Sequence, residues 1–411
     1  MRILMLTQWF DPEPFFKGIP FAKELSALGH DVEVLTGFPN YPGGKVYQGY
    51  RVRPFQRELI DGIRINRVAL YPSHDKSRVR RAINYLSFAL SATFIGTFLV
   101  SKADVAYVYH PPATIGLPAL ALKWFRKIPY VYDVQDLWPD TVGVSGMINS
   151  SIVFWLIDRW CRFVYRQSEK VVVLSPGFKR ELQERGVRGE KIEVIYNWCN
   201  EESLDIQPRK SELSEELGLN ETFNIMFAGN IGKAQGLESV LDAASIIEKR
   251  FPEIRFVFVG SGVELHSLKS KAQKMSLGNV LFLGRRSLEE IGEVLSLADV
   301  LLVHLKPDPL FQITIPSKTQ TYMHVQKPIL MAVSGDAASI VEEAGAGVSC
   351  VSGDARSIAS AAERLYSMPK TQLEEMGKSG REYYKTHMSR SVSIKRFEDI
   401  FKEAANGKRE S

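Results

Sequence analysis

Short apolar runs alternate with longer amphipathic segments along most of the chain, and this alternation predicts a parallel α/β protein. In the first half, runs such as 3–8, 31–36 and 104–109 have the length of buried strands. The segments 20–28 and 118–127 repeat apolar residues at helical spacing. Because strands that alternate with helices build parallel sheets, the pattern predicts Rossmann-like βα units.

The second half opens with the clearest of these units, in which the apolar run 223–228 leads into a glycine loop and a helix start. Gly229, Gly232 and Gly236 let the backbone approach a bound group. The following helix N-terminus offers unpaired N–H groups to an anion, and Lys233 adds a positive charge. The unit predicts a phosphate or diphosphate site, with an ordinary strand-to-helix turn as the alternative.

The order of elements divides the chain into two α/β domains. We expect a first domain at 1–196, a linker at 197–222, which carries charges and no strand pattern, and a second domain at 223–388. A last amphipathic helix within 389–411 is expected to return to the first domain. Strands of the second domain are expected near Phe223, Arg255, Val280, Val300, Ile329 and Val348.

The most apolar segment, 82–101, is predicted to be a core helix. Its uninterrupted apolar part, 88–100, is roughly 13 residues and therefore short for a membrane span. Arg78, Arg80 and Arg81 precede it, so the pattern also allows a helix that docks on a membrane surface.

Composition and charge narrow the class of protein. With 411 residues, 45% hydrophobic and 24% charged, the chain is typical of a soluble globular protein of two or three domains. Residues 1–200 hold 26 Lys and Arg against 18 Asp and Glu, a net charge of +8, whereas the remainder holds 26 against 29, or −3. A basic first half favours anionic partners such as phosphates or an anionic membrane surface, with ordinary surface charge as the alternative. The first half lacks the GxGxxG pattern, so no dinucleotide cofactor is expected there.

Five motifs, in their order and spacing, resemble those of GT-B glycosyltransferases of family four. They are the sequence GHDV at 29–32, DVQDLWPD at 133–140, the glycine loop 227–236, the stretch 282–285, and PSKTQTYMHVQKP at 316–328. The resemblance implies an α/β GT-B fold, with two Rossmann-like domains facing across a cleft, the acceptor domain first and the nucleotide-sugar domain second. Within the family the chain looks most like bacterial surface-polysaccharide enzymes, including N-acetyl-L-fucosamine transferases of O-antigen and capsule synthesis.

The resemblance implies transfer of a sugar, such as the N-acetylated deoxyhexosamine L-FucNAc, from a UDP-sugar to a polyprenyl-diphosphate-linked saccharide. Retention of configuration is expected, and the location would be the cytoplasmic face of the cell membrane, as a peripheral protein on an anionic surface. No nucleic acid partner is expected. In GT-B enzymes a helix N-terminus and Lys or Arg side chains replace a metal at the leaving diphosphate, so neither a metal nor a cofactor is expected.

The resemblance also implies roles for residues of the second domain. Ser317, Lys318 and Thr319 would face the phosphates from a helix start. Asn230 and Gln235 stand where the family often has Arg and Lys, so phosphate charge must come from Lys233 and Lys318. Arg285 aligns with the family residue that contacts the nucleotide base, and Thr321 aligns with an acidic residue that holds the ribose. Gly18 would let the N-terminal loop close onto the donor. The full set of expected donor-binding residues is Gly18, Gly229, Asn230, Lys233, Gln235, Arg285, Ser317, Lys318, Thr319 and Thr321.

In the first domain, Asp136 follows the strand 130–134 and is the first candidate for the base at the acceptor hydroxyl. His110 is the second candidate, and Gln135 stands roughly in place of the family's active-site His. Each of them has a structural alternative. The aromatic residues expected to contact the acceptor, or to pack locally, are Trp9, Phe15, Phe16 and Tyr41. Two other functions remain open: a UDP-sugar 2-epimerase of the same fold, and a catalytically silent partner subunit.

Overall fold

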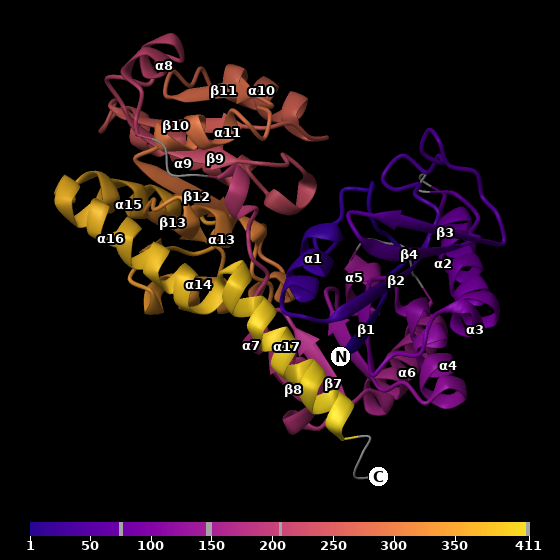
Figure 1. Ribbon diagram of the computed structural model, residues 1–411. Helices are drawn as coiled ribbons and strands as arrows, with labels where there is room; N and C mark the ends of the chain where they lie inside the picture. Colours follow the sequence, from indigo (N-terminus) through magenta and orange to yellow (C-terminus); the bar gives the residue numbers. More distant parts are fainter. Residues whose placement is uncertain (74–76, 145–149, 205–207, 408–411) are drawn as a thin grey trace. The chain divides into compact units, whose positions relative to one another are not determined.

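The structure, a computed structural model, describes residues 1–73, 77–144, 150–204 and 208–407. Its chain forms two compact units. The first contains Met1–Leu174, Phe178–Ile195 and Ile394–Ser411, and the second contains Ser175–Gly177 and Tyr196–Ser393. Each unit has a sheet with helices in the connections between its strands (Figure 1), which confirms the predicted α/β class with two Rossmann-like domains.

The first unit is built on an eight-stranded sheet in the order β3-β4-β2-β1-β5-β6-β7-β8. All its neighbours are parallel except β3 and β4, which form an antiparallel hairpin. Strand β1 lies between β2 and β5, so the chain direction around the sheet reverses there, and parallel sheets bind ligands at such a point. The strands are β1 Arg2–Leu6, β2 Asp31–Gly37, β3 Phe55–Ile60, β4 Ile63–Val68, β5 Val105–His110, β6 Tyr130–Val134, β7 Lys170–Val173 and β8 Ile192–Val194.

The helices of this unit follow the predicted apolar spacing. They are α1 Ile19–Ala27, α2 Arg78–Ser91, the π-helix Ala92–Gly96, α3 Thr97–Leu99, α4 Gly116–Arg126, α5 Asp140–Val144, α6 Ser151–Gln167 and α7 Pro176–Glu184. The last helix, α17 (Arg390–Asn406), belongs to the first unit from Ile394 onward. There the Phe397 ring lies 5.4 Å from that of Phe21, and Glu398 contacts His30 at 3.0 Å.

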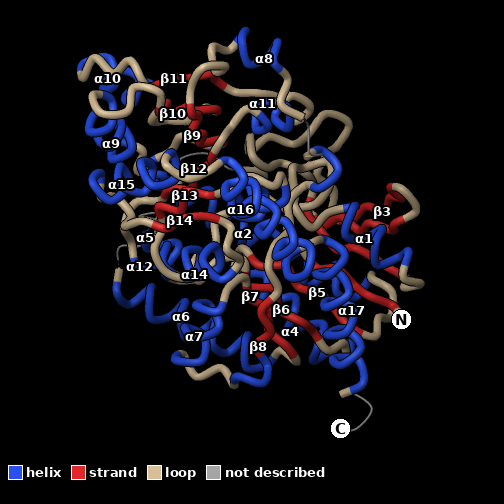
Figure 2. Tube along the Cα trace, turned by 90° about the vertical axis from the view of Figure 1, so that its left-hand side faces the viewer, coloured by secondary structure: helices blue, strands red, loops and turns tan. Residues whose placement is uncertain are grey.

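The second unit holds a six-stranded parallel sheet in the order β11-β10-β9-β12-β13-β14. Its strands are Val-, Ile- and Phe-rich and mostly buried, as expected for a sheet covered on both faces. Figure 2 shows these strands in red with helices on both sides. The strands are β9 Phe223–Ala228, β10 Ile254–Val259, β11 Val280–Gly284, β12 Val300–His304, β13 Ile329–Ala332 and β14 Gly347–Ser349. The helices are α8 Ser211–Glu216, α9 Glu238–Glu248, α10 Leu265–Lys274, α11 Ile291–Ser296, α12 Pro309–Gln312, α13 Ser317–His324, α14 Asp336–Glu343, α15 Ala355–Tyr366 and α16 Lys370–Tyr383.

The apolar segment 82–101 differs from the predicted core helix. Tyr85, Phe88 and Ala89 on one face are buried, but Phe94 and Phe98 on the other face are exposed. The whole stretch Arg78–Leu99 is long and apolar enough to cross a membrane by length and composition. Its buried face contributes to the core of the first unit, so only one side of the helix is available to another partner.

Candidate functional site

A cavity of about 660 Å³ lies in the second unit, where β9, β10 and β11 end. Gly229 follows β9, Gly260 follows β10 and Arg285 follows β11, while the first turn of α13 closes another side. The location agrees with the rule that parallel sheets place ligands beyond the carboxyl ends of their strands.

Two glycines make the strand ends fit together at this cavity. Gly229 and Gly260 have φ of +137° and +142°, which side chains rarely adopt. A Cβ on Gly260 would lie 1.9 Å from the carbonyl oxygen of Gly229, and one on Gly229 would lie 2.8 Å from Cε of Lys318. The glycines therefore let β9 and β10 end close together and leave room for the lysine side chain.

Lys318 brings a positive charge to the cavity from the first turn of α13, in addition to Arg285 and Arg286. Its ammonium lies 4.8 Å from the centre of the Phe227 ring, and burial lowers the pKa of Lys318 to about 8. Among the described residues no carboxylate forms an ion pair with it. A largely buried ammonium beside the N-terminal end of a helix is a suitable site for a phosphate group.

Helix α13 is joined to the end of β9 by Tyr322, which lies one turn after Lys318. The Tyr322 hydroxyl donates a hydrogen bond to the carbonyl oxygen of Ala228 at 3.2 Å and accepts one from its N–H at 2.9 Å. These two hydrogen bonds hold the helix that carries Lys318 next to the strand end that precedes Gly229.

The other side of the cavity is apolar. Leu204, Leu288, Ile291 and Leu295 line it, next to the polar groups of Arg285 and other residues. A cavity with an apolar wall and an anion site at one end suits a nucleotide, whose base is flat and whose phosphates are charged.

Six of the ten expected donor-binding residues line this cavity: Gly229, Asn230, Arg285, Ser317, Lys318 and Thr321. Thr319 is buried beneath the helix start. Lys233 lines a separate cavity of about 560 Å³ together with His304 and Lys306. The Gln235 side chain accepts a hydrogen bond from the Gly232 N–H at 3.0 Å and so shapes the glycine loop itself.

Gly18, the remaining donor candidate, belongs to the first unit and precedes α1. A Cβ there would lie 2.1 Å from the Asp11 carboxylate, which accepts a hydrogen bond from the Ile19 N–H at 2.7 Å. The glycine thus makes room for the residue that binds the start of α1. Its expected role at the donor stays a prediction.

Sequence reasoning missed about two thirds of the cavity lining. Asn200 and Leu204 come from the expected linker, and the apolar wall comes from the region of α11. Their sequence carries no motif, so only the folded chain brings them together. Ser261 could have been found, because it follows a predicted strand end. The residues missed are Asn200, Leu204, Ala228, Val259, Gly260, Ser261, Arg286, Ser287, Leu288, Ile291, Leu295 and Tyr322.

The first unit contains a buried ion pair at the end of β6. The Lys17 ammonium donates to the Asp133 carboxylate at 2.5 Å, and both side chains are inaccessible to solvent. Asp133 also accepts hydrogen bonds from the Tyr107 hydroxyl and from the Gln135 amide, both at 2.6 Å. Gln135 is therefore held by the sheet and positions the start of the DVQDLWPD loop.

Asp136 lies next in this loop, and its carboxylate has no hydrogen-bond or ion-pair partner among the described residues. Burial raises the pKa of Asp136. The pKa values of Tyr85 and Tyr109 are raised mainly by burial. The nearby charge of Asp136 is a smaller cause that also raises them. A carboxylate with a raised pKa at a strand end suits proton transfer.

Several aromatic rings lie close to Asp136 and contact one another. Trp9 lies 5.2 Å from Tyr41 and 6.2 Å from Tyr85, which in turn lies 6.4 Å from Trp138. Phe15 packs edge-on against Tyr109, 4.6 Å between ring centres, and Phe16 is exposed. Of the expected acceptor residues, Trp9, Tyr41 and Phe15 thus contact aromatic rings close to Asp136. Tyr85, Tyr109 and Trp138 were not foreseen.

Glu13 ties together the loops that carry these rings. Its carboxylate accepts hydrogen bonds from the N–H groups of Phe10, Asn40 and Tyr41, at 2.9, 2.6 and 2.7 Å. The side chain is buried, and burial, despite these hydrogen bonds, raises the pKa of Glu13. A single carboxylate therefore sets the position of Tyr41 relative to the segment that carries Trp9.

His110, the second candidate base, is completely buried at the end of β5. It lies 5.5 Å from the Tyr132 ring and 6.0 Å from that of Trp138. Its ring nitrogens have no hydrogen-bond partner among the described residues, and burial lowers the pKa of His110 to about 3. The ring is therefore neutral at physiological pH and packs as part of the aromatic cluster.

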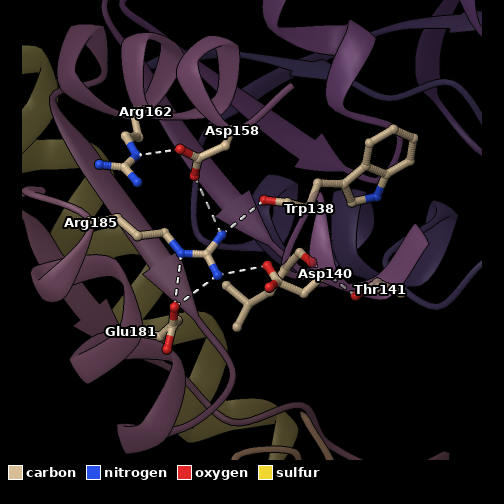
Figure 3. Close-up of polar contacts among 8 residues, drawn as sticks. Trp138, Asp140, Thr141, Asp158, Arg162, Glu181 and Arg185 are labelled. Atoms are coloured by element: carbon tan, nitrogen blue, oxygen red, sulfur yellow. Dashed lines mark hydrogen bonds and ion pairs between the residues drawn. The ribbon is translucent and has the colours of Figure 1, made fainter. Parts of the chain in front are cut away.

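Arg185, which follows α7, holds the far end of the same loop (Figure 3). Its guanidinium donates to the Trp138 carbonyl oxygen at 3.2 Å, to the Asp140 carboxylate at 2.6 Å and to Glu181 at 2.8 Å. Asp158 lies 3.9 Å from the same guanidinium. With Lys17 acting through Asp133 at the start of the loop, these contacts fix both sides of Asp136.

Comparisons with known proteins assign the two halves of the chain to glycosyltransferase families. Residues 20–198 match the family described as glycosyl transferase 4-like domain, and residues 209–383 match glycosyl transferases group 1. The chain is a GT-B glycosyltransferase of the GT4 family (group 1). It therefore uses a nucleotide sugar.

Relatives of this glycosyltransferase include two bacterial glycosyltransferases, one of them named for colanic acid biosynthesis. It is 24% identical over 335 residues to the probable glycosyltransferase WbjE of Pseudomonas aeruginosa, covering 80% of this chain and 82% of that protein. It is 27% identical to WcaI of Escherichia coli (strain K12), named as a colanic acid biosynthesis glycosyl transferase, covering 77% of each chain. The fold is also that of Anabaena HepE, solved in complex with UDP and glucose, with a TM-score of 0.68 at 15% identity over 97% of this chain and 99% of that one.

Proposed function

We propose that this glycosyltransferase transfers a sugar from a UDP-sugar to a polyprenyl-diphosphate-linked saccharide, in the synthesis of a bacterial surface polysaccharide. The observation that carries the proposal is the Lys318 ammonium, largely buried and without a carboxylate partner among the described residues, at the helix start that borders the cavity. It supports the binding of an anionic group at one end of a cavity whose other side is apolar.

UDP is the proposed donor nucleotide because a solved structure of the same fold holds UDP and glucose. A uracil base would pack on the apolar wall near Leu288, within reach of Arg285. The diphosphate would face Lys318 and the first N–H groups of α13, which would stabilise its negative charge as the glycosidic bond breaks. This assignment needs neither a cofactor nor a metal. Among the residues that the structure describes, no group of three metal-binding side chains is close enough to hold an ion.

Asp136 is the proposed proton acceptor for the acceptor hydroxyl, and the rings of Trp9 and Tyr41 are proposed to contact the acceptor sugar. Aromatic faces pack well against the apolar faces of sugars, while the carboxylate forms the polar contact. We propose retention of configuration, which the resemblance to family four implies. The proposed site of action is the cytoplasmic face of the cell membrane, where a polyprenyl-linked acceptor is located.

The proposed sugar is an N-acetylated deoxyhexosamine such as L-FucNAc. It is supported by the resemblance of the motifs to the surface-polysaccharide branch of the family, with WbjE and WcaI among the relatives. The test is to incubate the protein with a panel of UDP-sugars, including UDP-L-FucNAc, with and without a polyprenyl-linked saccharide, and to follow products by mass spectrometry. An elongated lipid only with UDP-L-FucNAc supports the whole proposal. Elongation with another sugar corrects the donor alone.

The same experiment separates the two other functions. A UDP-sugar 2-epimerase would convert the donor to its C2 epimer without an acceptor. A catalytically silent subunit would leave every donor and acceptor unchanged. Either result would refute the transferase proposal, provided that calorimetry shows UDP binding and hence a folded site.

A further inference from the structure

The first unit exposes a wide apolar surface built from α2–α3, α4 and α6. Large side chains that a soluble domain normally covers point outward on all three: Phe94 is 70% exposed, Phe125 67% and Trp155 56%. We call this surface the aromatic platform. It consists of Val79, Ile83, Leu86, Leu90, Phe94, Phe98 and Leu99 on α2–α3, Trp124 and Phe125 on α4, and Ile152, Trp155, Leu156 and Phe163, which share one stripe of α6.

The platform is continuous across the three elements, which pack against one another in the first unit (Figure 1). The Phe98 ring on α3 lies 6.2 Å from that of Phe125 on α4. Its neighbour Trp124 lies 6.2 Å from Phe163 on α6. Contiguous apolar surface of this extent is uncommon on a soluble monomer and marks a docking site.

Positive charge accompanies the platform. The segments that carry it, 78–99, 116–126 and 151–167, contain eight Lys or Arg residues and one acidic residue, Asp158. Three of the arginines, Arg159, Arg162 and Arg166, line a hollow of about 470 Å³ with Leu156, Trp160 and Phe163 on α6. Arg162 contacts Asp158 at 2.7 Å, whereas no ion pair is formed by Arg159 or Arg166 among the described residues. Guanidinium groups next to exposed aromatic rings suit a surface of anionic head groups above an apolar layer.

The buried face of the same helices shows whether they could cross a bilayer or only contact its surface. Phe88, Ala92 and Thr97 are in the core of the first unit, and so are Leu122 of α4 and Val164 of α6. A span across the bilayer would have to remove these residues from the core. The platform can therefore contact a membrane from one side only, as an interfacial surface does.

We propose that the aromatic platform docks this protein on a bilayer that contains anionic lipid, with the rings inserted at the head-group level and the arginines at the lipid phosphates. A second copy of the chain is a poorer occupant, because two identical platforms would bring Arg159 and Arg166 of one copy, which form no ion pair among the described residues, towards the same arginines of the other. The biological role of this docking rests on the proposed function, since a polyprenyl-linked acceptor lies in such a bilayer. The evidence for the docking comes from this surface alone.

The experiment is co-sedimentation of the full chain with vesicles of phosphatidylcholine, alone or with 30% phosphatidylglycerol, at low and high salt. We expect binding to the anionic vesicles at low salt, at least tenfold weaker binding in about 0.5 M salt, where charges beyond a few Å are screened, and release by alkaline carbonate. The variant Phe94→Ser/Phe125→Ser/Trp155→Ser should weaken binding at least tenfold, and Arg159→Ser/Arg166→Ser should remove the preference for anionic lipid.

A matched control changes exposed apolar residues outside the platform. Leu59 on β3 and Val263 in the second unit are 67% and 80% exposed, and Leu59→Ser/Val263→Ser should leave vesicle binding unchanged. All variants must retain UDP binding by calorimetry and a cooperative thermal transition, which shows that they fold. If the triple variant does not fold, single substitutions such as Phe94→Ser are tested for vesicle binding in its place.

Several results would overturn the inference. They are the absence of binding to anionic vesicles at low salt, equal loss in the control variant, resistance to carbonate, and a stable dimer in which the platform variants become monomeric. None of these results bears on the cavity of the second unit. Transfer to a soluble acceptor analogue with failed vesicle binding refutes the platform alone, whereas vesicle binding without transfer refutes the proposed function alone.

Discussion

Replacing Lys318 by Met should weaken UDP binding by roughly 10- to 150-fold, since it removes the charge and keeps most of the side-chain volume. Burial lowers the pKa of Lys318 from 10.5 to about 8, which corresponds to about 3 kcal/mol of lost preference for the charged form. A diphosphate next to the ammonium would restore that preference. A hydrogen bond between charged groups contributes about 1.5–3 kcal/mol, and 1.4 kcal/mol is a factor of ten in affinity, which gives the predicted range.

The same pKa predicts how affinity depends on pH. In the free protein Lys318 is about 90% protonated at pH 7 and about 10% at pH 9, because its pKa is about 8. A bound diphosphate would raise the pKa of Lys318 again, so the contribution of the ammonium to binding is complete below pH 8 and is lost as pH rises above it. We expect UDP to bind about tenfold more weakly at pH 9 than at pH 7. The Lys318→Met variant should show no such change.

Isothermal titration calorimetry with UDP between pH 7 and pH 9 measures both effects, and this range avoids the titration of the nucleotide phosphate near pH 6. Lys269→Met is the matched control, because Lys269 also places its ammonium near an aromatic ring, 5.8 Å from the centre of Phe282, but does not line the cavity. If Lys318→Met bound UDP as tightly as the control, or if its affinity fell by the same factor at pH 9, the assignment of the diphosphate to Lys318 would be wrong.

Three further predictions concern chemistry and stability. Asp136→Asn should leave the calorimetric affinity for UDP unchanged and lower sugar transfer about 100-fold or more, whereas equal loss of both would indicate a structural role. Transfer should continue at an unchanged rate in EDTA, and complete loss that added Mg²⁺ restores would contradict the metal-free assignment. Lys17→Met should lower the free energy of unfolding by about 3–5 kcal/mol in urea titrations, because it leaves the Asp133 carboxylate buried without its cation, and Lys17→Met/Asp133→Asn should recover part of that loss.

Much of the fold was predictable from the sequence because buried parallel strands are short apolar runs. The β3–β4 hairpin was missed, although Asp61 and Gly62 at its turn both have positive φ and form a dipeptide common in two-residue hairpins. Strand β3 alternates between partly and largely exposed positions, so its apolar content is too low to predict a buried strand. For the segment 82–101 the sequence left both a core helix and a surface-docking helix open, since an apolar residue carries no sign of whether the fold covers it.

The site was predictable where a motif placed polar residues at a strand end or a helix start. Ser317, Lys318 and Arg285 reached the cavity for that reason, as did Gly229. Lys233 had the expected charge in the expected loop but lines a different cavity, because the loop turns away after Asn230. A loop motif specifies the order of its residues along the chain, and the direction of each side chain depends on packing that distant residues provide.

A comparison of three buried lysines shows why Lys318, and not burial alone, indicates a ligand. Lys17 pairs with Asp133, so its charge is neutralised within the protein. Burial lowers the pKa of Lys327 to about 8, as it does for Lys318, but Lys327 donates to the carbonyl oxygens of Ser296 and Ala298, both at 2.7 Å, and thereby ends a helix. Lys318 has the same lowered pKa and faces a cavity, without a carboxylate partner among the described residues. A lowered pKa is thus common to a lysine whose ammonium the protein binds and to one that faces a cavity, and the distinguishing feature is whether the protein itself supplies the oxygen atoms.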